Sequence, residues 1–283
     1  MAEYAHPEAL VSTDWVAQHS NDPTVRIVEV DVDTRAYNEA HVPGAIAWSW
    51  HTQLCDTVRR NILPQQQFEA LMAASGVTPG TTLVIYGDNN NWFAAWAFWQ
   101  AKIYGHRDIR LMNGGRKKWL SDGRDVSVDV PHIAPVPYQA HAADLSLRAF
   151  LPHVQDASTH RSAALVDVRS PQEFTGEILA PPGLPETCQR GGHIPGARSI
   201  PWGKACNDDG SFKTADELRA LYAHEGIDGS KPVIAYCRIG ERSSHTWFVL
   251  KYLLGFDDVT NYDGSWTEWG NLVGANVERG AAA

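Results

Sequence analysis

The sequence predicts an α/β protein made of two similar halves, each with a mainly parallel sheet flanked by helices. Short β-branched runs alternate with amphipathic segments in both halves, as expected when helices join parallel strands. Each half also contains a short apolar run after a glycine-containing segment, at residues 83–86 and 233–236, which is typical of a strand buried on both faces. Landmarks around these runs recur at a nearly constant spacing, which indicates a duplicated domain.

Two blocks carry the repeat. Gly76 precedes the first apolar run and recurs as Gly226 before the second, a spacing of 150 residues. Further upstream, His-Val-Pro-Gly-Ala at residues 41–45 recurs as His-Ile-Pro-Gly-Ala at residues 193–197, a spacing of 152 residues. Two copies predict tandem domains rather than a solenoid, because a solenoid needs more repeats to bury its core.

The expected elements follow one order in both halves. A β-branched strand comes first, then a Pro-Gly turn, an amphipathic helix, the buried strand and a long apolar helix. The segments, first copy then second, are 25–30 and 164–168, 65–74 and 215–224, 83–86 and 233–236, and 92–104 and 243–254.

The proposed domain limits follow from this order. The first domain is expected at residues 1–125 and the second at residues 144–283. Residues 126–143 are rich in proline and show no amphipathic period, so they are expected to form an extended linker.

Composition narrows the class of protein. The 283 residues suit two domains of about 140 residues each. The net charge of −9 argues against a nucleic-acid partner, and no apolar run is long enough for a membrane span. The first ten residues lack a basic segment followed by an apolar run, so a cytoplasmic protein without a secretory leader is expected. No Cys-x-x-Cys pair occurs among the four cysteines, so no metal site is expected.

The chemistry is expected directly after the second buried strand, at Cys237-Arg238-Ile239-Gly240-Glu241-Arg242. This position is the carboxyl edge of a parallel sheet, where α/β proteins bind ligands. The start of a helix and two arginines are expected to stabilise the thiolate of Cys237 and lower its pKa. The alternative is a small buried cysteine with no chemical role.

The first copy provides an internal control. At the spacing of 150 residues, Gly87 stands opposite Cys237 and Asp88 stands opposite Arg238. The first copy therefore lacks both the nucleophile and the basic residues. We expect it to serve as a structural partner that covers the site of the second copy.

These motifs resemble the rhodanese family, in its tandem-domain thiosulfate sulfurtransferase form. Each motif is weak by itself, but their order in both halves, with a cysteine loop only in the second, is specific. The resemblance rests on residues 41–45, 108–119, 167–169, 193–197, 237–242 and 262–266.

The resemblance implies a reaction in two steps. The Cys237 thiolate takes the outer sulfur of thiosulfate, sulfite leaves, and the persulfide passes its sulfur to cyanide or a thiol. The loop residues Arg238, Ile239, Gly240, Glu241 and Arg242 would bind the donor, and no metal or organic cofactor is implied. Two arginines suit a compact dianion, whereas relatives that act on mercaptopyruvate tend to have a small uncharged loop. A 3-mercaptopyruvate sulfurtransferase remains an alternative, as does a non-catalytic sulfur-carrier or partner-binding module.

One departure concerns substrate contacts. Many tandem relatives have an arginine just before the aromatic residue that follows the Asp-Val-Arg strand, but here Glu173 precedes Phe174. Arg190 is a candidate to replace that arginine. Cys188 is a candidate resolving thiol, with an inert buried cysteine as the alternative. Asp167 with Arg169, and the histidines His41 and His193, are expected to be structural.

Overall fold

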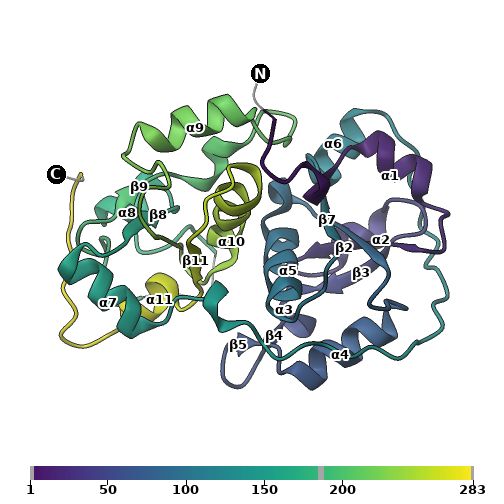
Figure 1. The fold of residues 1–283 in the computed structure, drawn as a ribbon, viewed down its shortest axis with the longest axis horizontal. Helices are drawn as coiled ribbons and strands as arrows, with labels where there is room; N and C mark the ends of the chain where they lie inside the picture. Colours follow the sequence, from purple (N-terminus) through teal and green to yellow (C-terminus); the bar gives the residue numbers. More distant parts are fainter. Residues whose placement is uncertain (1–2, 184–187, 282–283) are drawn as a thin grey trace. The chain divides into compact units, whose positions relative to one another are not determined.

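The chain folds into two compact units, and the computed structural model describes residues 3–183 and 188–281 (Figure 1). The N-terminal unit consists of His6–Leu145 together with Cys206–Phe212, a short segment from the second half of the sequence. The C-terminal unit consists of the remaining described residues of the second half and of residues 3–5. Each half of the sequence therefore contributes a short segment to the unit that the other half mainly builds.

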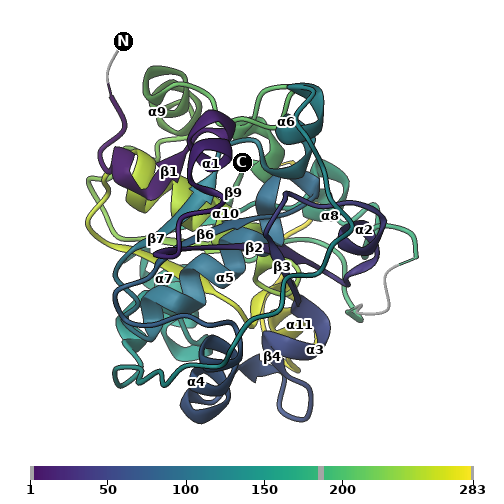
Figure 2. The same ribbon diagram turned by 90° about the vertical axis from the view of Figure 1, so that its right-hand side faces the viewer.

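The N-terminal unit contains a five-stranded sheet in the order β1-β7-β6-β2-β3, and all neighbouring strands are parallel (Figure 2). A separate antiparallel pair, β4 with β5, lies outside this sheet. The strands are β1 (Leu10–Val11), β2 (Val25–Asp31), β3 (Ile46–Ser49), β4 (Cys55–Asp56), β5 (Asn61–Ile62), β6 (Thr82–Tyr86) and β7 (Ile109–Met112).

Helices cover both faces of this sheet. The helix α5 is apolar almost all round, and it packs against β2, β6 and β7 (Figure 2). On the opposite face, Val16 of α1, Tyr37 of α2 and Trp119 of α6 share a core with strand residues. The helical segments are η1 (Pro7–Ala9), α1 (Thr13–His19), α2 (Arg35–Glu39), α3 (Trp50–Gln53), α4 (Gln65–Ala74), η2 (Asn89–Asn91), α5 (Trp92–Ile103) and α6 (Gly115–Ser121).

The C-terminal unit contains a four-stranded parallel sheet in the order β11-β10-β8-β9. An isolated parallel bridge between Arg148 and Asn261 lies beside β11, where the N-terminal unit has its edge strand β1. The strands are β8 (Ala164–Asp167), β9 (Arg198–Ser199), β10 (Val233–Tyr236) and β11 (Val259–Tyr262). The two parallel sheets confirm the predicted fold class.

The helices of the C-terminal unit repeat the same layers. The helix α10 packs against β10 and β11 on one face, and residues of α7, α8 and α11 share a core with the other face. The helical segments are η3 (Leu145–Leu147), which begins in the other unit, α7 (Leu151–His160), α8 (Pro171–Thr175), η4 (Trp202–Ala205), α9 (Ala215–Ala223), α10 (Glu241–Phe248), η5 (Val249–Leu253) and α11 (Ser265–Trp269).

One predicted helix differs from the structure. We expected it at residues 243–254, but α10 begins at Glu241 and passes into a π-helix, η5, at Val249. The earlier start follows from Gly240, whose φ of +101° ends the loop two residues sooner and which caps the helix.

Residues 126–143 hold no helix or strand beyond an isolated antiparallel bridge between Ser127 and His41. Further backbone hydrogen bonds, from Val136 to Ala73 and from His141 to Tyr104, keep this segment on the N-terminal unit. In the described part of the chain, no helix combines the length and the apolar character needed to cross a bilayer.

Candidate active site

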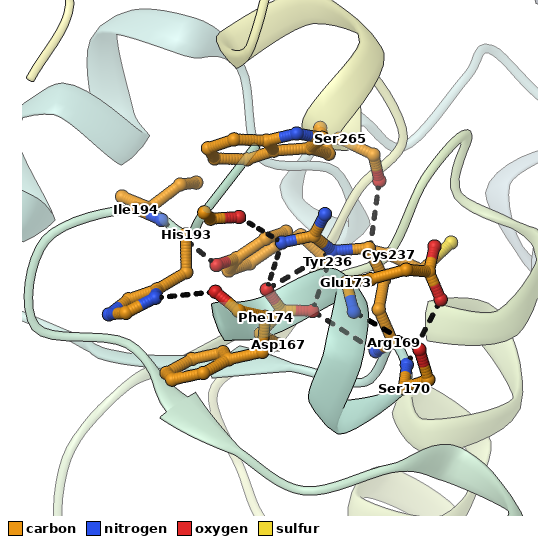
Figure 3. A network of polar contacts seen from close by, with 12 residues as sticks. Asp167, Arg169, Ser170, Glu173, Phe174, His193, Ile194, Tyr236, Cys237 and Ser265 are labelled. Carbon is orange, nitrogen blue, oxygen red and sulfur yellow. Dashed lines mark hydrogen bonds and ion pairs between the residues drawn. The ribbon is translucent and has the colours of Figure 1, made fainter. Parts of the chain in front are cut away.

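Cys237 lies at the carboxyl end of β10, in the short loop that leads into α10 (Figure 3). Its backbone N–H donates to Ser265 Oγ at 3.1 Å, and its Sγ accepts the backbone N–H of Gly240 at 3.1 Å. Its thiol donates to Glu241 Oε2 at 3.3 Å, and the side chain is fully buried. The sulfur is therefore held between an amide at the start of a helix and a carboxylate.

The loop around this sulfur is fixed from two sides. The carbonyl of Gly240 accepts Asn261 Nδ2 at 3.1 Å, which ties the loop to β11. The amides of Trp266 and Thr267, in the first turn of α11, donate to the carbonyls of Cys237 and Arg238, each at 3.0 Å. The loop is thus held in place by β11 and α11, which would fix the position of a reactive group in it.

Three buried ion pairs lie at the carboxyl ends of β8 and β10 and in the helices that follow. Each of the six residues is at most 5% exposed. Every arginine near the cysteine is therefore paired with a carboxylate, and the cluster carries no excess positive charge. The pairs are Arg169 Nη2 with Asp167 Oδ2 at 2.6 Å, Arg242 Nη1 with Glu173 Oε2 at 2.9 Å, and Arg238 Nη2 with Glu241 Oε1 at 3.8 Å.

The charge pairing overturns the prediction of a lowered pKa for Cys237. Burial raises the pKa of the Cys237 thiol, and the Glu241 carboxylate raises it further. The positive charge of Arg242 and hydrogen bonds from Ser243 act in the opposite direction but do not prevail. The sequence showed the arginines beside the cysteine, whereas the compensating Glu173 lies on another helix.

Glu173 is the carboxylate that engages Arg242, with Oε1 accepting Nη2 at 3.1 Å beside the contact already described. The side chain is oriented by the first turn of α8, where Ser170 and Glu173 form a capping box (Figure 3). Although burial works against the charged form, hydrogen bonds from Arg242 lower the pKa of Glu173. Glu173 is therefore a buried carboxylate committed to one arginine.

Comparison with known protein families identifies this arrangement. A model of the Rhodanese-like domain matches the chain twice, at residues 12–122 and 152–272. The chain belongs to the rhodanese family. The two matches agree with the two sheets, and they confirm the predicted family and the tandem repeat.

Full-length relatives support the assignment. The chain is 54% identical over 284 residues to a Haloferax volcanii protein provisionally named thiosulfate sulfurtransferase, covering 99% of both chains. It is 53% identical over 282 residues to the sulfur carrier protein TtuD of Thermus thermophilus, covering 98% of this chain and 99% of the relative. Among solved structures, an anaerobic ergothioneine biosynthesis enzyme from Chlorobium limicola has a similar fold, with a TM-score of 0.87 and 23% identity over 100% of this chain and 72% of that one.

Within this rhodanese, the structure gives Arg190 a different role from the one predicted. Its guanidinium donates to four backbone carbonyls at the end of α11 and in the segment that follows. These bonds cap the helix and use four of the five N–H donors of the guanidinium, and the substrate contact expected of Arg190 stays a prediction. The contacts are Nη2 to Trp269 O at 2.8 Å and to Leu272 O at 2.7 Å, Nε to Gly270 O at 3.0 Å, and Nη1 to Ala275 O at 2.6 Å.

The other sequence candidates lie in structural surroundings. His41 stacks on Tyr37 with ring centroids 3.7 Å apart, and His193 stacks on Phe174 at 3.6 Å. The two rhodanese domains thus share this packing, although only the second has a cysteine at this sheet edge. Cys188 is buried in the core of the C-terminal unit and donates to the carbonyl of Arg190 at 3.1 Å.

The first rhodanese domain has no space for a side chain at Gly87, which stands opposite Cys237 at the repeat spacing. At Gly87, a Cβ atom would lie 2.3 Å from the carbonyl oxygen of Val30 and 2.7 Å from Asp31 Oδ1, closer than real Cβ contacts. The backbone N–H of Gly87 donates to Asn91 Oδ1 at 2.9 Å, which occupies the place of Glu241 at the repeat spacing. A side chain at this position would therefore require the sheet edge to move.

Residues that sequence reasoning missed lie around the loop rather than in it. Ser265 and Asn261 hold the loop, yet neither has a recognisable pattern of its own. Ser265 does fall in the Tyr-Asp-Gly-Ser-Trp block at residues 262–266, which was one of the motifs behind the resemblance. Among the described residues, no three His, Cys, Asp or Glu side chains are grouped so that they could hold a metal ion.

Proposed function

We propose that this rhodanese transfers sulfane sulfur from thiosulfate to cyanide or a thiol through a persulfide on Cys237. One observation carries the proposal: the Cys237 sulfur sits at the carboxyl edge of the sheet, between the Gly240 amide and the Glu241 carboxylate. A thiol in this place has a donor ready to stabilise negative charge on sulfur, which a merely structural cysteine does not need.

The reaction balances without a cofactor. The Cys237 thiolate attacks the outer sulfur of thiosulfate, a sulfur–sulfur bond forms, and the bond to the sulfonate sulfur breaks with its electron pair on sulfite. Cyanide then attacks the outer sulfur of the persulfide anion, and the sulfur–sulfur bond breaks. Thiocyanate leaves, and the Cys237 thiolate is regenerated. The Gly240 N–H can donate to the sulfur of Cys237 in both of its anionic forms.

The proposed donor rests on the relatives rather than on the arginines of the loop. Arg238 and Arg242 flank the nucleophile, but Arg242 is already bound by Glu173, so the site offers less net positive charge than the loop sequence indicates. Thiosulfate remains the proposed donor because of the names of the relatives. Mercaptopyruvate is the alternative donor, and the assay below compares the two.

A second candidate function is sulfur relay to a protein acceptor. It is favoured by the 53% identity to a Thermus thermophilus protein named as a sulfur carrier. A carrier would form the same persulfide on Cys237, so the two functions differ only in the second step. Partners would then include an acceptor protein in addition to small-molecule thiols.

We also propose a division of labour along the chain. The second domain, residues 144–283, holds the nucleophile, and the first domain, residues 1–125, has a structural role. The support comes from Gly87, where the backbone leaves no space for a reactive side chain.

Steady-state kinetics test the proposed activity. Initial rates of thiocyanate formation should follow ping-pong kinetics in thiosulfate and cyanide, because a covalent intermediate separates the two substrates. Replacing thiosulfate by mercaptopyruvate should give a lower kcat/KM. Persulfide formation without turnover to cyanide or small thiols would favour the carrier function, and no persulfide with either donor would contradict both.

A further inference from the structure

We propose that the Glu241 carboxylate is the catalytic base that takes the proton from the Cys237 thiol and later returns it. The inference rests on the proposed sulfur transfer and adds a residue to its machinery. Cys237 Sγ lies 3.3 Å from Glu241 Oε2, and the two side chains are 0% and 1% exposed. The proton is therefore already shared with this carboxylate in a site closed to bulk water.

A base is needed because the resting thiol is neutral. Burial raises the pKa of Cys237, so the attacking thiolate cannot accumulate by simple loss of a proton to solvent. Since the thiolate and not the thiol attacks sulfur, some nearby group must accept the proton as the reaction starts. The Gly240 N–H at 3.1 Å then stabilises the anion that is left.

Other groups near the loop are less suited to this task. Glu173 is bound by Arg242 and Asp167 is bound by Arg169, each at hydrogen-bond distance. Burial lowers the pKa of His245, one turn further along α10, to about 3, so it is a weak proton acceptor. Glu241 instead directs Oε2 at the thiol, and its Oε1 lies 3.8 Å from each of two arginines.

The first domain provides a natural comparison. Gly87 stands opposite Cys237 at the repeat spacing, and Asn91 stands opposite Glu241. Where the nucleophile is absent, the residue in the place of the carboxylate is an amide, which binds the Gly87 backbone at 2.9 Å and cannot accept a proton. The second domain therefore has both the thiol and the carboxylate, whereas the first domain has neither at the equivalent positions.

The proton balance closes over one turnover. The Cys237 thiol gives its proton to Glu241, and the thiolate then forms the persulfide bond while sulfite leaves with its own electron pair. After the acceptor removes the outer sulfur, the Cys237 thiolate takes the proton back from the Glu241 carboxylic acid. No oxidant, reductant or further proton donor is required.

The test uses the full-length protein with Glu241→Gln, and its strength is that the two explanations predict opposite signs. If Glu241 only raises the thiol pKa by its charge, removing the charge should speed the reaction of Cys237 at neutral pH. If Glu241 is the base, single-turnover sulfite release from thiosulfate should slow by about a hundredfold at neutral pH. The deficit should shrink as pH rises, because hydroxide can then remove the proton.

Alkylation of Cys237 by iodoacetamide gives a second readout that does not depend on sulfur transfer. It should show the same slowing in Glu241→Gln and the same recovery at high pH. If the wild type releases no sulfite, the proposed function fails while alkylation still tests Glu241. The exposed Glu177→Gln is the matched control and should behave as the wild type.

Glu241→Asp keeps a carboxylate and serves as the second variant. The rate of alkylation of Glu241→Asp should depend on pH as in the wild type but should be lower throughout. If Glu241 had only a structural role, Glu241→Asp and Glu241→Gln would show the same pH dependence. If Glu241→Gln does not fold, the pH dependence of the Glu241→Asp rate, compared with that of the wild type, tests the proposal. Alkylation of a folded Glu241→Gln at or above the wild-type rate at neutral pH would overturn the proposal, as would an Asp profile without the wild-type shape.

The pH profile must be interpreted with the other charged groups of the elements packed around Glu241. Apart from His245, each of these groups lies in an ion pair. These groups are Arg238 in the loop, Arg242 and His245 on α10, Asp167 and Arg169 after β8, Glu173 on α8, and Asp263 after β11 with its partner Arg148.

Discussion

Arg242 and Glu173 form the pair at which the structure departs most from the chemistry expected of the loop. The arginine was expected to wait for an anionic donor, but its guanidinium is bound by a carboxylate through two hydrogen bonds. Such a pair is costly to break on one side, because the remaining charge is left buried without its partner. The pair therefore sets the geometry of the loop as well as its charge.

A double-mutant cycle measures this coupling. Arg242→Met alone should lower the free energy of unfolding by about 3–5 kcal/mol, since Glu173 then remains charged and buried. Adding Glu173→Gln should restore much of the loss, because the unpaired charge is removed. Urea denaturation of the four proteins gives the coupling energy, and strictly additive losses would mean that the pair contributes nothing.

Asp31 gives a second prediction for a single residue. Its carboxyl group is buried near Asp88, and Oδ2 has no hydrogen-bond partner. Burial and the negative charge of Asp88 raise the pKa of Asp31 to about 9. Because the folded state holds this proton more tightly than the unfolded state, the contribution of Asp31 to stability is full below about pH 4 and is lost as pH rises towards 9.

Asp31→Asn should therefore stabilise the protein at neutral pH. The amide oxygen can still accept the backbone N–H of Asp88, which lies 2.7 Å from Oδ1 in the wild type. The gain in Tm should be clear at pH 7 to 8 and should shrink as the pH falls to about 4 and below, where Asp31 becomes protonated in the unfolded state as well as in the folded state. A gain of equal size at every pH would contradict the raised pKa.

Among the elements, the first turn of α11 has the clearest role, because it holds the loop that contains Cys237. Ser265 Oγ accepts the Cys237 N–H at 3.1 Å and donates to the carbonyl of Tyr262 at 2.6 Å. Ser265→Ala leaves a buried N–H without a partner, which typically costs about 1–3 kcal/mol.

Ser265→Ala should therefore lower both the free energy of unfolding and the rate of persulfide formation, because Cys237 is no longer held. The exposed Ser230→Ala, which removes a hydrogen bond to Asp228 in a turn, should leave the rate unchanged. Stopped-flow measurement of persulfide formation compares the two variants. Equal rates in Ser265→Ala and wild type would show that the turn does not position the nucleophile.

The elements themselves could largely be predicted from the sequence. The buried strand at residues 233–236 and the helix at residues 65–74 match β10 and α4, because glycine boundaries and periodicity are local signals. The start of α10 was missed because it depends on the left-handed conformation of Gly240. The neutralised charge of the site was missed because Arg242 and Glu173 meet only through the fold.

The whole molecule adds an exchange of segments that no local pattern indicates. Cys206–Phe212, from the second half of the sequence, belongs to the N-terminal unit. There the backbone N–H of Phe212 donates to Asn113 Oδ1 at 2.9 Å, and Asp209 pairs with Lys118 at 3.4 Å. The buried side chain of Phe212 therefore depends on residues encoded in the other half.

A fragment of residues 144–283 should accordingly be less stable and a poorer enzyme than the full chain. It would expose Phe212, which is 4% exposed in the intact protein, and it would lose the hydrogen bond from Ala5 N to Leu253 O. The fluorescence of a dye that binds apolar surface measures the exposed apolar area of the fragment and of the full chain. The rate of thiosulfate turnover compares their activities. Equal stability and equal turnover would show that the second half is independent.

Cys237 is the residue that we propose carries the sulfur. Intact mass spectrometry after incubation with thiosulfate and removal of excess donor tests this proposal directly. The wild type and Cys188→Ser should each gain the mass of one sulfur atom, which cyanide then removes, while Cys237→Ser should gain none. A sulfur adduct on folded Cys237→Ser, or an unmodified wild type, would contradict the account.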